Sequence, residues 1–229
     1  MKKIFIITVL TVFANIASAV TGGIDIGFKS KLLEQGTVTG VNMIAAGANV
    51  EVASFGFGVN TYSTYERNAG ASSGVFKRVD LVADYNFTST LADLNIGVRY
   101  KNASKSAAFN GVRDNVQPFV TLCGKIWDVT LLNDLKNRSN NIEGNLKLPV
   151  STGIKNFSVV PAVGVGFNDP GATTIAALKN VKKYYNGSVG VAYKTPAGVF
   201  AVNGFVHRKN LTDNYGQITG YNAGYTLSF

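Results

Sequence analysis

Apolar and polar residues alternate with a period of two in one segment after another along this chain. In GIDIGF, residues 23–28, the isoleucines and the phenylalanine share one face, and Asp25 and Gly27 share the other. YNAGYTLSF, residues 221–229, keeps the same period to the final residue. Because successive side chains of a β-strand point to opposite faces, this pattern predicts strands with one apolar and one polar face. The sequence therefore predicts an all-β fold.

Twelve such segments of roughly 10 residues each follow residue 22, a length that crosses the apolar band of a membrane at a tilt. Their connections alternate in length. Short turns are expected at 53–54, 88–93, near 124, at 151–156 and at 195–198, and longer loops at 66–75, 102–114, 168–182 and 208–218. This asymmetry is typical of transmembrane antiparallel up-and-down β-barrels. We predict one barrel domain at 20–229 with 12 strands, or ten because VNMIAAGANVEV at 41–52 loses strict alternation.

The first 19 residues have the pattern of a signal peptide. Lys2 and Lys3 precede a mostly apolar stretch from Ile4 to Ile16, and Ala17-Ser18-Ala19 has the small–x–small pattern of a cleavage site. We therefore expect export and cleavage after Ala19.

Composition excludes several classes of protein. The chain has 46% hydrophobic and 15% charged residues and 25 glycines, and its mature part has no apolar run near the ~18 residues of a membrane helix. Without Lys2 and Lys3, 20 basic residues face 13 acidic ones, a formal charge of +7. The basic residues form no long tract, so we expect no nucleic-acid partner. The single Cys123 cannot form an intramolecular disulfide.

A soluble β-sandwich would also alternate, with its apolar face turned inward. Here the polar face is rich in glycine, serine, threonine and asparagine, which suits a wet interior. Aromatic residues, among them Tyr62, Tyr85, Phe87 and Trp127, gather near strand ends, where interfacial girdles lie in membrane barrels. In hydrocarbon, strands satisfy every backbone group only in a closed sheet. The last strand is therefore expected to pair with the first.

The terminal strand carries a resemblance to a known class. Tyr221, Tyr225, Leu227 and Phe229 share its apolar face, and the chain ends on the aromatic. With the predicted signal peptide, this strand resembles those of bacterial outer-membrane β-barrel proteins of the porin-like class. The resemblance implies a bacterial outer-membrane location, contact with membrane lipid and lipopolysaccharide, and reading of the terminal strand by the barrel-assembly machinery.

The polar face would line the lumen, where charged side chains bias which solutes pass. The lumen-lining and selectivity residues that we predict are Lys29, Arg78, Asp80, Asp84, Arg99, Lys101, Lys147 and Lys194, together with Glu51, Asp128 and Glu143. Basic residues form a modest majority, so the sequence favours a narrow passive channel for small polar or anionic solutes. A non-conducting structural or adhesive barrel, whose lumen is closed by salt bridges, is the alternative.

Enzymatic function has weaker support. Gly164 and Gly166 imitate a dinucleotide-binding motif, but Asp169 stands where its third glycine should be and no βαβ unit surrounds it. His207, the only histidine, would have to be the base of a barrel hydrolase, and we expect it at the rim instead. Histidine and cysteine are too few for a zinc site, and we predict no cofactor; a carboxylate calcium site stays open. The 168–182 loop is expected to hold a short helical turn.

Overall fold

The computed structural model describes residues 20–34, 37–66, 74–103, 114–169, 183–209 and 217–229. The predicted signal peptide and the predicted helical turn lie outside these residues. In the described part of the chain, no helix is long and apolar enough to cross a membrane.

The regular elements of the described residues are β-strands. Their bounds are β1 Val20–Glu34, β2 Thr37–Val52, β3 Phe55–Glu66, β4 Gly74–Phe87, β5 Asp93–Ala103, β6 Asn115–Cys123, β7 Trp127–Asp134, β8 Ser139–Lys147, β9 Val150–Ser151, β10 Phe157–Asp169, β11 Lys183–Lys194, β12 Gly198–Lys209 and β13 Ile218–Ser228.

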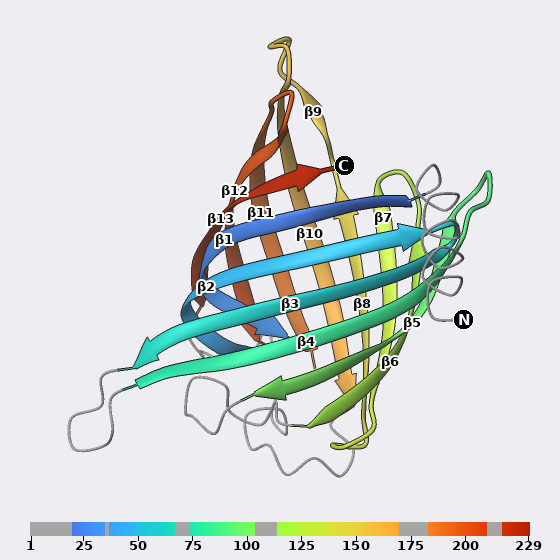
Figure 1. Cartoon of the computed structure of the whole chain (residues 1–229), viewed down its shortest axis with the longest axis vertical. Coiled ribbons are helices and arrows are strands. Elements are labelled where there is room, and N and C mark those ends of the chain that lie inside the picture. Colours follow the sequence, from blue (N-terminus) through green and yellow to red (C-terminus); the bar gives the residue numbers. More distant parts are fainter. Residues whose placement is uncertain (1–19, 35–36, 67–73, 104–113, 170–182, 210–216) are drawn as a thin grey trace, which may run out of the picture.

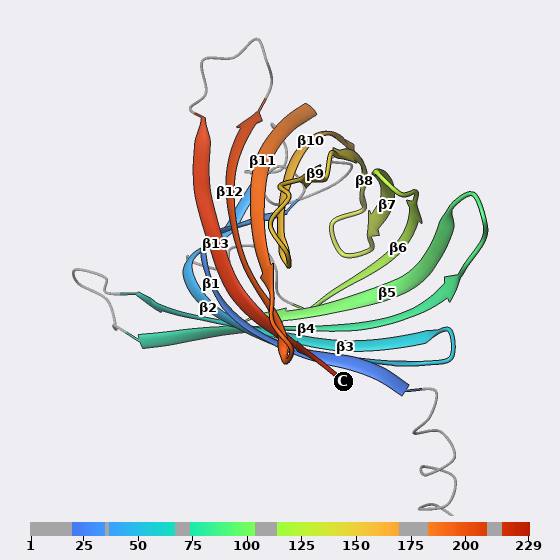
Figure 2. The ribbon, with the colours of Figure 1, turned by 90° about the horizontal axis from the view of Figure 1, so that it is seen from above.

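Twelve of these strands form a closed antiparallel ring (Figures 1 and 2). Each of β1 to β7 pairs with the next strand, β8 pairs with β10, and the series continues through β13 back to β1. The two-residue β9 pairs with β10 and continues the line of β8 after an interruption at residues 148–149, where Pro149 has no N–H to donate to the ladder. The predicted 12-stranded barrel is confirmed, and the ten-stranded alternative is wrong.

The seam between β1 and β13 uses the final residue of the chain. Ile24 lies opposite Leu227 in the ladder, and Ile26 lies opposite Tyr225. One step further, Gly22 and Phe229 exchange two backbone hydrogen bonds of 3.0 Å. This pairing explains why the alternation continues to the end of the sequence.

The polarity of this barrel is the reverse of that of a soluble domain. Among the described residues, twelve polar or charged side chains are buried, against six hydrophobic ones. Large apolar side chains, such as Ile26, Phe57 and Leu81, are instead about half exposed on the outer face. The apolar stripe therefore faces outward and the polar stripe surrounds the interior, as the sequence predicts.

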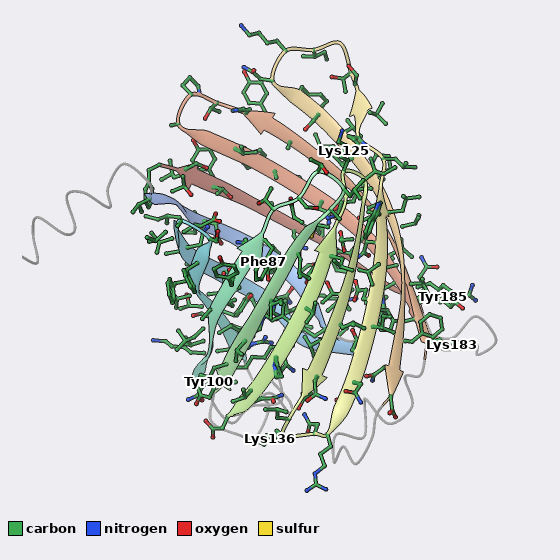
Figure 3. The ribbon with its side chains drawn as sticks, turned by 90° about the vertical axis from the view of Figure 1, so that its right-hand side faces the viewer. Phe87, Tyr100, Lys125, Lys136, Lys183 and Tyr185 are labelled. Carbon is green, nitrogen blue, oxygen red and sulfur yellow. The ribbon has the colours of Figure 1, made fainter. Side chains whose placement is uncertain are left out.

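The two rims of the barrel differ. Lys125 and Lys136, on the connections at either end of β7, lie at opposite ends of the molecule in Figure 3. The Lys125 rim carries the short turns, and Ala53 turns there with a φ of 56°. The other rim carries the longer connections but also a short one at 135–138, which sequence analysis did not predict.

Aromatic side chains at the short-turn rim match the predicted girdle only in part. Phe55, Tyr85 and Phe87 form an edge-on cluster on adjacent strands, with ring centroids 4.7 and 4.5 Å apart. Tyr62 was expected in such a girdle, and this prediction is wrong: the side chain is 8% exposed and faces the lumen. It shares the inward face of β3 with Asn60 and Thr64, so strict alternation would have placed it correctly.

Candidate functional site in the barrel lumen

The end of β1 and the start of β2 leave the wall of the barrel. β1 pairs with β13 only as far as Lys29, and β2 pairs with β3 only from Ile44. Beyond these points the two strands pair with each other alone, from Lys31 opposite Val41 to Glu34 opposite Thr37. We call residues 30–34 and 37–43 the lumen hairpin. Figures 1 and 2 show this blue end of the sheet turning into the ring.

Side-chain contacts replace the wall ladder where the hairpin turns inward. The backbone N–H of Tyr221 donates to Ser30 Oγ at 2.7 Å, and Thr64 Oγ donates to the carbonyl of Val41 at 3.0 Å. Asn42 has a φ of 48°, which lies in the left-handed region that asparagine tolerates better than most residues. A shift of register between Leu32 and Leu33 then changes which side chains face the wall.

Glu34 links the lumen hairpin to strands β4 and β5 of the barrel wall. Arg78 on β4 donates Nη1 and Nη2 to the two Glu34 oxygens, at 2.9 and 2.5 Å. Lys101 on β5 donates Nζ to the same carboxylate at 2.7 Å. Arg78 also donates to both Asp80 oxygens, at 2.7 and 2.6 Å. This charged cluster holds two cations and two carboxylates, so its charges cancel.

The cluster is buried within the barrel. Arg78 is 0% exposed, and Asp80 and Lys101 are each 3% exposed. Forked hydrogen bonds between a guanidinium and a carboxylate are among the strongest polar contacts in proteins, and low local dielectric strengthens them further. Removing any one member would leave the others with buried, uncompensated charge.

Aromatic rings support the neighbouring lumen cations. The Tyr62 ring lies between Lys29 and Arg78, with its centroid 5.5 Å from Lys29 Nζ and 5.2 Å from Arg78 Cζ. Arg99 lies over the Phe119 ring at 5.9 Å. Such contacts favour cations electrostatically through the negative face of the ring.

Amide groups replace charges on the strands that follow β5, from β6 to β10. The buried side chains there include Asn115, Gln117, Asn137, Asn141 and Asn168. Several of them converge on one acid, because Asn115, Gln117 and Asn137 all donate to Asp134 Oδ2, at 2.6, 2.9 and 3.0 Å. These contacts fix the short connection at 135–138 against the start of β6.

A second polar group lies around Tyr184 on β11. Its hydroxyl donates to Glu143 Oε2 at 2.6 Å and accepts from Asn141 Nδ2 at 3.0 Å. The ring lies over Gly166, where an added Cβ would overlap it. Gly166 therefore serves packing, not dinucleotide binding. His207 packs its ring 5.4 Å from that of Tyr184. It lies two residues before the end of β12, at the predicted end of the strand, and its side chain is buried.

Described residues of the hairpin line two cavities in the lumen. The charged chamber, of about 320 Å³, is lined by Glu34, Tyr62, Asp80, Arg99, Lys101 and Glu143, among others. The lysine chamber, of about 340 Å³, is lined by Lys29, Lys31, Lys147, Asn186, Asn203 and Asn222, among others. Leu32, Leu33 and Asn145 line both cavities. The two leucines thus stand between the chambers.

The structure places most of the predicted lumen residues around these chambers. Arg78 belongs to the charged cluster, and Lys147 forms an ion pair of 2.6 Å with Asp128 while more than half exposed.

Asp84 and Lys194 line neither chamber. Asp84 is packed over Gly56, and its Oδ1 has no hydrogen-bond partner among the described residues. Lys194 lies at the exposed short-turn rim, next to the turn at 195–197. Their predicted role in selectivity stays a prediction, as it does for the rest of the set.

Sequence reasoning missed Glu34 and the two leucines. Alternation from Ile24 puts Lys29 and Lys31 on the lumen face, and the same period would turn residue 34 outward. The register shift at Leu32 and Leu33 reverses this phase. Two consecutive leucines in an alternating segment were the available signal for an irregularity.

The structure offers no clear metal site. In the strands and turns that it describes, no three His, Cys, Asp or Glu side chains are grouped so that they could hold a metal ion.

No protein family and no curated protein matches this chain in sequence. Among solved structures, it is similar to a structure titled KdgM porin, with a TM-score of 0.57 and 14% identity over 90% of this chain and 99% of that one. It also matches the outer membrane protein OprD of Pseudomonas aeruginosa, with a TM-score of 0.38 and 10% identity over 90% of this chain and 65% of that one. The first likeness shows that the chain has the fold of a bacterial outer-membrane porin.

Proposed function

We propose that this protein is a passive outer-membrane channel for small polar solutes, with a preference for anions. The observation that carries the proposal is the lysine chamber. Three lysines line it, and none of the described residues around it is a carboxylate. Rings of charged side chains bias which ions enter a pore, so a solute in this chamber meets positive charge.

The lysines differ in how far the protein itself compensates them. Lys147 shares its charge with Asp128. Lys29 lies over the Tyr62 ring, and neither Lys29 nor Lys31 forms an ion pair with a described residue. Lys31 is therefore the residue whose field is most available to a solute.

Amide groups of the same chamber would contact the polar part of a solute. Asn203 and Asn222 lie opposite each other on β12 and β13, and the Oδ1 atom of each is buried without a hydrogen-bond partner among the described residues. A buried hydrogen-bond acceptor without a donor lowers the stability of the folded protein. Water or a hydrated solute in the chamber would satisfy both atoms.

The outer face supports a location in the outer membrane. Tyr221, Leu227 and Phe229 on the terminal strand are 56%, 41% and 67% exposed, which suits contact with lipid. We also propose that the barrel-assembly machinery reads this strand and that lipopolysaccharide surrounds the loop rim. The channel function needs no catalytic residue.

Liposome swelling tests the proposal. Liposomes that contain the folded protein should swell in isosmotic solutions of small polar solutes, and faster with small organic anions than with cations of similar size. Protein-free liposomes are the control. Folded, inserted protein that gives no swelling with any solute would refute the channel function.

A second function, that of a closed structural barrel, is favoured by one observation: the lumen hairpin occupies part of the interior. Such a barrel would give no swelling in the same assay, whereas replacement of its rim loops would abolish binding to a partner or a surface.

A further inference from the structure

We infer that the lumen hairpin sets the size of the solute that can pass, with Leu32 and Leu33 as the specificity-determining residues and Glu34 as their positioning residue. Selection by size refines the channel function proposed above and rests on it. It is carried by the position of the hairpin, by its anchoring and by its independence from the ladder of the wall.

The position follows from the two chambers. Walls of the charged chamber come from β3 to β8, whereas those of the lysine chamber come mainly from β8 to β13. Leu32 and Leu33 line both, and so does Asn145 on β8. The hairpin therefore reaches from the β1 side of the lumen toward β8. A solute that moves between the chambers must pass the two leucines.

The two leucines form an apolar partition in a polar lumen, and such a partition is a barrier to water and to hydrated solutes. Leu32 packs against a small buried cluster of Met43, Ala45, Tyr62 and Ala103, which holds it in place. Water wets a narrow apolar gap poorly, and channels use such constrictions as gates. Shortening the leucines would both widen the gap and make it easier to wet.

The anchor is Glu34. It accepts hydrogen bonds from Arg78 and Lys101, which lie 44 and 67 residues away in the sequence and on two different wall strands. These contacts fix the last described residue of β1 against the wall. Glu34 lines the charged chamber but, unlike the two leucines, not the lysine chamber, so at the partition it acts through the leucines that it positions.

The hairpin can be displaced without opening the ring. Residues 31–34 and 37–41 pair only with each other, and the wall ladders on either side stop at Lys29 and Ile44. Among the contacts of the described residues, movement of the hairpin would break those of Glu34, Ser30 and Thr64 and the packing of Leu32, but none of the β1–β13 or β2–β3 ladder pairs, which stop at Lys29 and Ile44. A narrow element that is separate from the wall can change the bore while the barrel stays intact.

Single-channel conductance in planar bilayers tests the inference on the full chain. The double variant Leu32→Ala/Leu33→Ala should raise conductance roughly twofold or more. A matched double variant on the outer face, Leu81→Ala/Leu146→Ala, should leave it at the wild-type level, since both leucines face outward. Glu34→Gln should increase the frequency of transitions between current levels, because it weakens the anchor and keeps the leucines.

If the double variant does not fold, a second measurement tests the inference on cysteine variants. In a Cys123→Ser background, Leu33→Cys should make the current sensitive to a charged thiol reagent, whereas Leu81→Cys should not. Folding of each variant is checked by its heat-dependent migration in detergent gels.

The outcomes separate this inference from the channel function. If wild type conducts and neither leucine variant changes conductance or reagent sensitivity, the hairpin inference is wrong and the channel stands. If wild type is silent and Leu32→Ala/Leu33→Ala opens a pore, the inference holds, but wild type is not an open passive channel. If all folded variants are silent, both are wrong.

Discussion

The charged chamber and the lysine chamber occupy one lumen and have similar volumes, about 320 and 340 Å³, but they use charge in opposite ways. In the charged chamber, Glu34, Asp80 and Lys101 form ion pairs with Arg78 or with each other, so these charges stabilise the fold. In the lysine chamber, Lys29 and Lys31 have no ion-pair partner among the described residues. The comparison teaches that pairing, and not the number of charges along a lumen, decides which charges act on a solute.

The largest expected effect tests the structural role of the charged chamber. Arg78→Met should lower the free energy of unfolding by roughly 3–5 kcal/mol, because it leaves Glu34 and Asp80 buried without their partner. Urea unfolding in detergent micelles measures the change. Lys31→Met, in the lysine chamber, should change the unfolding midpoint little. If both variants lost the same free energy of unfolding, the two chambers would not differ in their contribution to stability.

The next effect tests the functional role of the lysine chamber. Lys31→Glu should reduce the anion-to-cation permeability ratio by roughly an order of magnitude, since each unit charge at contact distance contributes about 1 kcal/mol even in water and the substitution changes two. The reversal potential under a KCl gradient measures the ratio. Arg99→Gln, whose cation contacts the Phe119 ring in the charged chamber, is the control and should shift the ratio less.

A smaller effect concerns Lys147, which is paired but exposed. Lys147→Met should destabilise the barrel by less than about 1 kcal/mol, because solvent screens an exposed ion pair. Its effect on the reversal potential should be weaker than that of Lys31→Glu, since it changes the charge of the chamber by one unit and not by two. An effect on stability as large as that of Arg78→Met would contradict the assignment.

The smallest effect is that of salt. Raising ionic strength from 0.1 M to 1 M shortens the screening length from about 10 Å to about 3 Å. The anion preference should therefore decline with salt, while the unfolding midpoint, which depends on the buried charged cluster, should change little. A preference that is unchanged in high salt would indicate selection by shape and not by the lysines.

Sequence patterning predicted the wall of this barrel well, for a physical reason. Side-chain direction in a strand is fixed by the pleat, so a period of two assigns each residue to lipid or lumen wherever it persists. The placement of Arg78 and Lys101 inside and of Ile26 and Phe57 outside follows from that rule alone. The pairing of the last strand with the first follows from the need to close the ring.

The hairpin could not be predicted in the same way. Residues 31–34 still form a strand that pairs with 37–41, so local pattern gives no sign that the pair leaves the wall. What places it inside is the contact of Glu34 with Arg78 and Lys101, whose strands are distant in sequence. The burial of His207 could not be predicted for a similar reason: its neighbours Arg208 and Lys209 give no sign of it, whereas the Tyr184 ring on the adjacent strand provides the buried contact.

The central claim is that the inward polar face of this barrel encloses a path for solutes in which unpaired lysines select for anions. The reversal potential of the wild-type protein in a planar bilayer under a KCl gradient tests it most directly. The account predicts an open pore whose reversal potential has the sign of chloride-favouring permeation. A potassium-favouring sign, or folded and inserted protein that passes no current, would contradict it.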